Sequence, residues 1–185
     1  MTIIGTPATP DSVDAIITLA ELTTFLDGFT ATDAAKLEAI ELASDRIEQA
    51  CGVAFTPRTA TETVTASNGK ALLGNPMVIT VDTVDAVAVG VGPYPSGQIP
   101  LDGTDHTVVY TYGYPTPPSP IKRAVKLLAR HHLIQDPTDL DSRATFKSNE
   151  MASWSLVTPG VRGAQFPIPE VNQIVADYTF AGGVY

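Results

Sequence analysis

Apolar residues recur at helical spacing in the first third of the chain. Thr18 and Glu21 form a capping-box pattern that predicts a short helix over residues 18 to 27, ending at Gly28. A longer helix is predicted over residues 32 to 51. Its inward stripe follows a 3-4-3-4 spacing, widened by three further residues, and consists of Leu37, Ile40, Ser44, Ile47 and Cys51 with Leu42, Ala43 and Ala50.

The pattern changes between residues 58 and 112 to short β-branched runs separated by Gly, Pro and Asn, which is typical of antiparallel strands and turns. Asn68-Gly69 suits a two-residue turn, so the first two strands should form a hairpin. The stretch from 90 to 103 is rich in Gly and Pro and predicts a loop. The expected strands cover residues 61–65, 71–73, 78–81, 84–89 and 107–112.

A third helix is predicted over residues 120 to 135, because Ser119 is a good cap and Pro120 suits a first helical position. Its inward residues are Ile121, Val125, Leu128 and His132, and its flank carries a basic ridge of Lys122, Lys126 and Arg130. Residues 138 to 166 lack a pattern and predict a long loop around Trp154. Pro169 begins a last short helix, with Val171, Ile174, Val175 and Tyr178 inward.

These elements predict an α+β protein with a mainly helical core: two N-terminal helices plus a central basic helix, with an inserted small antiparallel β lobe and an extended C-terminal tail. We expect a flexible arm over 1–17, a core domain over 18–135 with its β lobe at about 58–112, and a variable loop, helix and docking tail over 136–185. The expected buried residues are Leu37, Ile40, Ile47, Val125 and Leu128.

Charge narrows the choice of partners. The net charge of −9 repels a polyanion, so nonspecific DNA binding through a basic patch is not expected. The first 50 residues carry nine Asp and Glu, whereas six of the 11 Lys and Arg lie between Lys122 and Lys147. This polarity along the chain either pairs neighbouring subunits electrostatically or is an ordinary solvated surface, and the sequence leaves both readings open. The acidic surface consists of Glu38, Glu41, Asp45 and Glu48. One cysteine, Cys51, and the lack of a long apolar run predict a soluble cytoplasmic protein without membrane contact.

Motifs for chemistry are missing from the sequence. It contains no phosphate-binding Gly-rich loop with Lys, no zinc-binding His-Glu-x-x-His and no Gly-x-Ser-x-Gly elbow. His131 and His132 are adjacent, and neighbours on a helix point about 100° apart, so they cannot clamp one metal. We therefore expect no enzyme activity, no catalytic residues, no cofactor and no metal.

Two segments carry a family resemblance. The first runs from Thr18-Leu-Ala-Glu-Leu-Thr-Thr-Phe-Leu-Asp27 through Leu37-Glu-Ala-Ile-Glu-Leu-Ala-Ser-Asp-Arg-Ile-Glu48 to Cys51-Gly52 and Thr56-Pro57-Arg58. The second joins Val108-Val-Tyr-Thr-Tyr-Gly-Tyr114 to Pro120-Ile-Lys-Arg-Ala-Val-Lys-Leu-Leu-Ala-Arg-His-His132. Over residues 18 to 135 the chain resembles the head-to-tail adaptor (head-tail connector, or head completion) proteins of long-tailed bacteriophages. It departs from them in residues 90 to 103 and after Pro137.

The resemblance implies a structural protein of the virion neck, assembled in the host cytoplasm. Family members form a ring, usually of twelve copies, beneath the capsid portal, and the ring extends the DNA channel towards the tail. The implied partners are further copies of the chain, the portal protein, and neck stopper or tail proteins, while DNA passes without specific binding. A stopper, a tail terminator, or an enzyme with an unrecognised site remain alternatives.

The resemblance also suggests where the portal contact lies. The segment from Pro169 onward ends in aromatic and small residues, and Tyr178, Phe180 and Tyr185 would offer large, rigid contact areas. The basic ridge of Lys122, Lys126 and Arg130 is the next candidate for this contact.

Overall fold

The chain folds into two compact units, which we describe separately. A computed structural model describes residues 4–5, 15–103, 105–134, 146–148, 153–155 and 165–180. The helical unit consists of Ile17–Cys51 and Ser119–Thr179, and the β unit consists of Met1–Ile16, Gly52–Pro118 and Phe180–Tyr185. The β unit is thus largely inserted in sequence between two helices of the other unit. The α+β class predicted from the sequence is confirmed.

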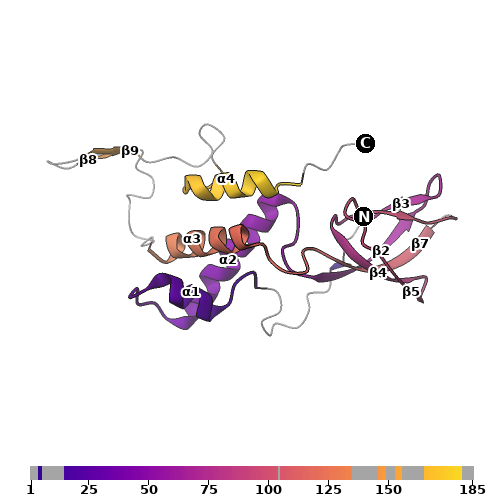
Figure 1. The fold of residues 1–185 in the computed structure, drawn as a ribbon, viewed down its shortest axis with the longest axis horizontal. Helices are drawn as coiled ribbons and strands as arrows, with labels where there is room; N and C mark the ends of the chain where they lie inside the picture. The colour runs from indigo at the N-terminus through magenta and orange to yellow at the C-terminus, as the bar shows by residue number, and fades with distance from the viewer. Residues whose placement is uncertain are drawn as a thin grey trace. The chain divides into compact units, whose positions relative to one another are not determined.

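The helical unit contains α1 (Leu19–Leu26), α2 (Asp33–Cys51), α3 (Ser119–Ile134) and α4 (Pro169–Tyr178). Helices α2 and α3 pack against each other, and α1 and α4 lie on opposite sides of this pair (Figure 1). Two short strands, β8 (Phe146–Ser148) and β9 (Ser153–Ser155), pair antiparallel. They lie within the segment predicted to be an irregular loop, so that prediction is wrong at these six positions.

The start of α1 follows from local chemistry. The Thr18 hydroxyl accepts a hydrogen bond from the Glu21 amide (3.2 Å), and the Thr18 amide donates to the Glu21 carboxylate (2.9 Å). These bonds satisfy two backbone donors that a helix leaves free at its first turn, so the predicted capping box is confirmed. At α2 the Thr32 hydroxyl accepts from the Ala35 amide (3.2 Å), as the sequence also indicated.

The core of the helical unit confirms four of the five expected buried residues: Ile40, Ile47, Val125 and Leu128 are at most 3% exposed. The fifth prediction is wrong, because Leu37 is 52% exposed, and Leu42 of the expected inward stripe is 41% exposed. The predicted stripe runs as one continuous face along the whole of α2. Its buried residues centre on Ala39, Ile40, Ala43 and Ile47, which leaves a broad outer face in solvent.

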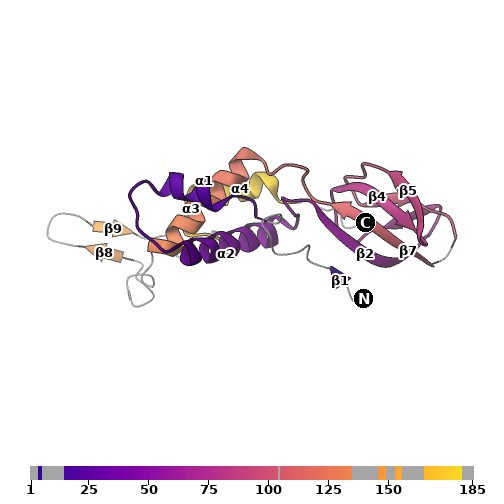
Figure 2. The ribbon, with the colours of Figure 1, turned by 90° about the horizontal axis from the view of Figure 1, so that it is seen from below.

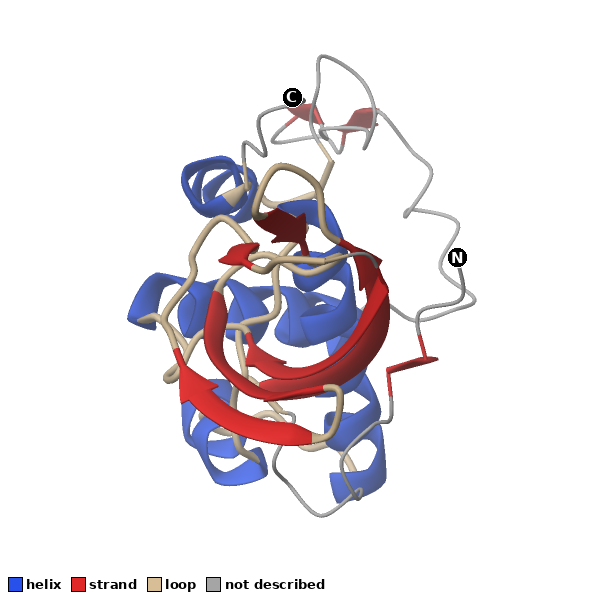
Figure 3. Ribbon diagram, turned by 90° about the vertical axis from the view of Figure 1, so that its right-hand side faces the viewer, coloured by secondary structure: helices blue, strands red, loops and turns tan. Residues whose placement is uncertain are grey.

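The β unit is built around one curved antiparallel sheet, in the strand order β1-β2-β7-β4-β5 (Figure 3). A second sheet pairs two short strands, β3 and β6. The bounds are β1 (Ile4–Gly5), β2 (Arg58–Thr65), β3 (Lys70–Leu72), β4 (Val78–Val84), β5 (Val87–Val91), β6 (Gln98–Pro100) and β7 (Asp105–Tyr112).

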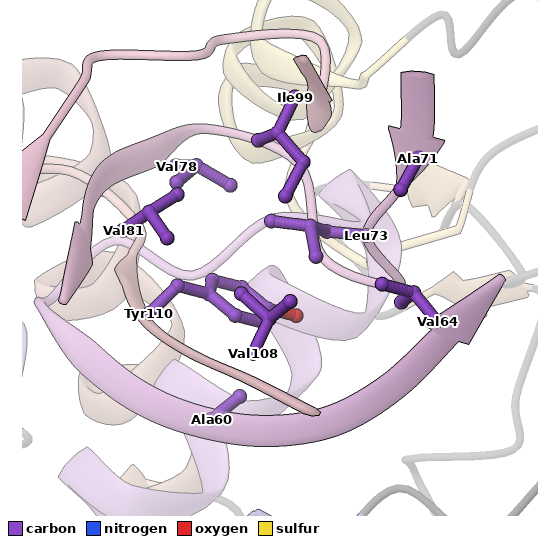
Figure 4. Close-up of a cluster of buried hydrophobic side chains, with 9 residues drawn as sticks. All are labelled: Ala60, Val64, Ala71, Leu73, Val78, Val81, Ile99, Val108 and Tyr110. Atoms are coloured by element: carbon purple, nitrogen blue, oxygen red, sulfur yellow. The ribbon is translucent and has the colours of Figure 1, made fainter. Parts of the chain in front are cut away.

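The small sheet contributes Ala71 of β3 and Ile99 of β6 to the core of this unit. In β2, residues alternate between buried and exposed, with threonines outward, as a half-buried strand requires. Figure 4 shows the buried side chains converging on a common interior, with Tyr110 among them. The cluster is Ala60, Val64, Ala71, Leu73, Val78, Val81, Ile99, Val108 and Tyr110.

Strand pairing differs from the prediction in the β unit. The Asn68-Gly69 turn forms, with both φ angles positive (54° and 72°), and Ser67 and Lys70 exchange backbone hydrogen bonds across it. The strands beyond it separate, because β2 pairs with β7 along its whole length and β3 pairs with β6. The predicted hairpin between residues 61–65 and 71–73 is therefore wrong. Strand β6 lies inside the predicted loop from 90 to 103.

The expected strand over residues 84 to 89 is interrupted by a turn. Asp85 and Ala86 both adopt positive φ (50° and 64°), so β4 ends at Val84 and β5 begins at Val87. The sequence predicts no fold for the N-terminal arm. Ile4 and Gly5 pair with β2, and Ile16 and Ile17 are 1% exposed, so that expectation is wrong at these positions. Residues 1–3 and 6–14 lie outside the described residues.

Candidate functional site

The described residues offer surfaces for contact and no arrangement typical of a metal centre. Within the described ranges, no group of three or more His, Cys, Asp or Glu side chains could hold a metal ion. The rings of His131 and His132 on α3 lie 6.2 Å apart, and burial lowers the pKa of both, that of His132 to about 4. None of the helices among these residues is long and apolar enough to cross a bilayer.

The residues of the basic ridge predicted on α3 have different environments in the fold. Lys122 is half-buried, and its ammonium lies 3.2 Å from the Glu21 carboxylate of α1. Neighbouring Arg123, which is not part of the ridge, donates through Nε and Nη2 to both carboxylate oxygens of Glu170 on α4. Helix α3 therefore uses two cations to hold its neighbours. At the other end of the ridge, Arg130 is exposed.

The predicted acidic surface keeps three of its four members. Glu38, Glu41 and Asp45 are exposed on α2, whereas Glu48 is only 9% exposed, so its assignment to the surface is wrong. One turn further on, the Cys51 thiol donates a weak hydrogen bond to the Val175 carbonyl of α4 (3.9 Å). Thus α4 covers α2 near its C-terminal end. Burial, with a further contribution from the charge of Glu48, raises the pKa of Cys51 to about 11.

Large apolar side chains are exposed on both units. In the helical unit they include Leu37 and Leu42 on α2 and Ile134 at the end of α3. In the β unit, the edge strand β5 has the sequence Val-Ala-Val-Gly-Val, and all five residues are exposed. Such an uncharged apolar edge strand is an association surface unless something covers it. The sequence pattern placed β-branched residues here but could not show which strand forms the edge.

Two polar clusters in the β unit have structural roles. Inside it, the Asn75 amide donates to the Tyr110 hydroxyl (2.8 Å), and the buried Glu62 carboxylate accepts from the Gly74 amide (2.8 Å). Burial raises the pKa of Tyr110 to about 12, and the nearby charge of Glu62 adds to this rise. The sequence did not predict the buried roles of Tyr110 and Glu62. A single Glu in an alternating strand, such as Glu62, carries no sign of burial.

The second polar cluster centres on His106 in β7. Its Nδ1 lies 2.7 Å from an Asp85 carboxylate oxygen, and its Nε2 lies 2.7 Å from the Asp102 carbonyl oxygen. The other Asp85 oxygen accepts from the Thr107 amide (2.9 Å). Hydrogen bonding to Asp85 raises the pKa of His106, because the imidazolium can donate to both acceptors. The cluster joins the β4–β5 turn to β7, and nothing in the sequence around His106 predicted it.

The proposed portal residues are only partly within the described structure. Tyr178 is half-buried at the end of α4, and Phe180 is 39% exposed. Thr179, between them, donates through its hydroxyl to the Val175 carbonyl (2.7 Å), which closes the last turn of α4. Tyr185 lies outside the described residues.

Comparison with known proteins gives fold relatives but no family. No family model matches the sequence, and no curated protein does. Among solved structures, a chain in the neck of an empty GTA particle, with C6 symmetry, is 21% identical and matches with a TM-score of 0.54 over 76% of this chain and 88% of that chain.

A chain in the neck of the native GTA particle, with C12 symmetry, is also 21% identical and matches with a TM-score of 0.55 over 75% of this chain and 87% of that one. A third match, in the virion of the native gene transfer agent particle, has a TM-score of 0.51, 21% identity and the same coverage of both chains, 75% and 87%. This chain therefore shares its fold, over most of its length, with chains of gene transfer agent particles.

Proposed function

We propose that this chain is a structural neck protein of a phage-like particle, acting as a head-to-tail adaptor. Copies of it form a ring, of about twelve subunits by analogy with the cyclic symmetry of the neck structures, beneath the portal of the capsid. The ring extends the DNA channel and provides the docking surface for the neck or tail. It catalyses no reaction, and it is built into the virion.

The observation that carries this proposal is the shared fold. The likeness covers 88% of a neck chain and 76% of this one. Neither unit by itself makes up that much of the chain, so the likeness extends into both. A likeness of this extent is hard to reconcile with a single borrowed motif. Because fold alone does not determine function, the surfaces of this chain must provide the second line of support.

The exposed surfaces of the chain favour its incorporation into an assembly. The uncharged edge strand β5 and the exposed leucines of α2 would be poorly protected in an isolated chain. The net charge of −9 would repel DNA phosphates, so DNA could slide past the ring without being held by counterion release. A subunit that associates with other copies and repels DNA has the properties expected of a channel wall through which DNA passes.

For the portal contact we propose the C-terminal segment, with Tyr178, Phe180 and Tyr185 as anchors. Removing residues 180 to 185 retains Thr179, whose hydroxyl closes α4, so the helical unit should fold normally. The truncated chain should then fail to join heads to tails. Normal yields of complete particles would move the contact elsewhere, with Lys126 and Arg130 next to be tested.

Electron microscopy of particles that contain this chain tests the proposed function. We expect a ring of copies between the portal and the tail, fitted by both units of the structure. If complete particles from the normal strain lack the chain, or carry it as one isolated copy, the adaptor role is refuted. In a separate experiment, a strain from which the gene is deleted should produce DNA-filled heads without tails.

A further inference from the structure

Two helices of the helical unit present outer faces of opposite charge. The acidic face of α2 carries five exposed residues, Leu37, Glu38, Glu41, Leu42 and Asp45. The basic face of α3 carries Lys126, which is half-buried, with Arg130 and Ile134, which are exposed. Each face combines apolar area with charge of one sign. The leucines are 52% and 41% exposed and Ile134 is 52% exposed, so all three have apolar surface left to bury.

Most of the charges on these faces have no ion-pair partner among the described residues. Lys126 lies near enough to Glu21 of its own chain to help lower the pKa of that carboxyl group. Elsewhere in the helical unit, Lys36, Lys122 and Arg123 form ion pairs with acidic residues of their own chain. Among the described residues, by contrast, no ion pair involves Arg130 or the three acidic residues of the acidic face. Arg46 is exposed at the margin of this arc of α2, and its charge helps burial to lower the pKa of His132.

The two faces of one copy cannot satisfy each other. Helices α2 and α3 pack against each other (Figure 2). Their buried sides centre on Ile40 and Ile47 in α2 and on Val125 and Leu128 in α3. Their outer faces therefore point in different directions, away from the shared core. A complementary pair of faces on different sides of one subunit is the arrangement of a head-to-tail contact, which forms closed rings when the rotation between subunits closes.

We propose that the acidic face of one copy docks against the basic face of the next copy. Glu41 and Asp45 pair with Arg130 and Lys126, while the exposed leucines cover Ile134. Opposite charge speeds the encounter and disfavours like-to-like contacts, and the apolar residues supply buried area. This interface rests on the proposed ring and gives it a defined subunit contact. The expected binding partner for each face is a second copy of the chain, because the chain itself carries both complementary surfaces.

Charge exchange in the full chain tests the interface by sedimentation velocity at low and high salt. The wild-type chain should self-associate, and salt should weaken the association by screening. Glu41→Lys and Arg130→Glu should each weaken it by about tenfold or more, as expected for close interfacial charge pairs. The double variant should restore association. An equimolar mixture of the two single variants should do so as well, because alternating copies again pair opposite charges.

Matched controls separate this contact from general charge effects. Asp177→Lys on α4 and Lys70→Glu in the β unit reverse the charge of exposed residues that lie outside both faces, and neither should alter association. Circular dichroism shows whether each variant retains its helices. If a charge-reversed chain does not fold, Glu41→Gln and Arg130→Gln remove the same pair without reversal, and Leu42→Ala tests the apolar part independently.

Three results would overturn the inference: a wild-type chain that stays monomeric at every concentration, folded single variants that associate normally, or a double variant that is not restored. The proposed function is judged separately by imaging particles. A neck ring that forms normally from the single variants removes this interface and leaves the adaptor role intact. If the chain associates in a charge-dependent way but is absent from every particle, the interface is retained and the adaptor role is refuted.

Discussion

Glu21 and Lys122 lie 101 positions apart in the sequence, yet their side chains meet at 3.2 Å, joining α1 to α3. The same Glu21 carboxylate accepts the Thr18 amide through its other oxygen. One residue therefore completes a helix cap and an ion pair between helices. Hydrogen bonding to Thr18, reinforced by Lys122, holds the pKa of Glu21 below its ordinary value.

Two substitutions at Glu21 separate these roles. Glu21→Ala removes both and should lower the free energy of unfolding by about 1 kcal/mol or somewhat more, the typical cost of a lost cap. Glu21→Gln retains an acceptor for the Thr18 amide and should cost only about 0.2–1 kcal/mol, as for an exposed pair. Urea unfolding followed by circular dichroism measures both. Equal losses in the two variants would show that the ion pair, and not the cap, dominates.

The lowered pKa of Glu21 sets the pH range of its contribution. A carboxyl group with a depressed folded-state pKa stabilises the fold above its unfolded value near 4.5. The contribution is lost as the pH falls through the lowered value. The stability difference between wild type and Glu21→Gln should therefore be constant at neutral pH and shrink in acid. A difference that grows in acid would contradict this assignment.

Tyr110 should make the β unit sensitive to alkali. Its pKa is raised to about 12, so between pH 10 and 12 the unfolded chain releases a proton that the folded chain retains. Stability should fall as the pH rises through this range. Tyr110→Phe should remove the phenolate absorbance that appears at the highest pH and, by leaving Asn75 without its acceptor, cost about 1–3 kcal/mol at neutral pH. An unchanged phenolate titration would refute the burial argument.

The His106–Asp85 contact should make the stability of the same unit depend on pH nearer neutrality as well. The pKa of His106 is raised, so its contribution is complete below the ordinary value of 6.5 and is lost as the pH rises through the folded value. Unfolding temperature across this range should fall less in Asp85→Asn, which keeps an acceptor for the Thr107 amide but lacks the charge. His106→Gln should remove this dependence altogether, and a variant that retains it would point to another group.

Leu37 and Ile40 test which side of α2 is buried. Ile40 is 3% exposed and Leu37 is 52% exposed, although both belong to the inward stripe read from the sequence. Ile40→Ala should cost on the order of 2–5 kcal/mol in unfolding free energy, and Leu37→Ala should stay within about 0.5 kcal/mol. Similar losses for both in the monomeric chain would restore the stripe as a continuous core face.

Local chemistry explains what could be predicted from sequence. A capping box, an N-cap at Thr32 and an Asn-Gly turn depend on bonds between residues no more than four apart, so α1, α2 and the turn at Asn68 were predictable. Helical periodicity likewise identified Ile47 and Leu128 as core residues. The acidic and basic positions of the candidate surfaces were also evident, because charge is a property of each residue alone.

Only the tertiary structure decided which of these positions are covered. Leu37 and Glu48 are eleven residues apart on α2 and point in nearly the same direction, since eleven residues make just over three turns. Yet Leu37 is exposed and Glu48 is buried, and the contact between the Cys51 thiol and the Val175 carbonyl places α4 near the Glu48 end of α2. In the same way, Asn68-Gly69 determines a turn but not a hairpin, because β7 offers β2 a longer partner than β3 does. Periodicity reports direction around one helix or strand, while burial and pairing depend on neighbours supplied by distant parts of the chain.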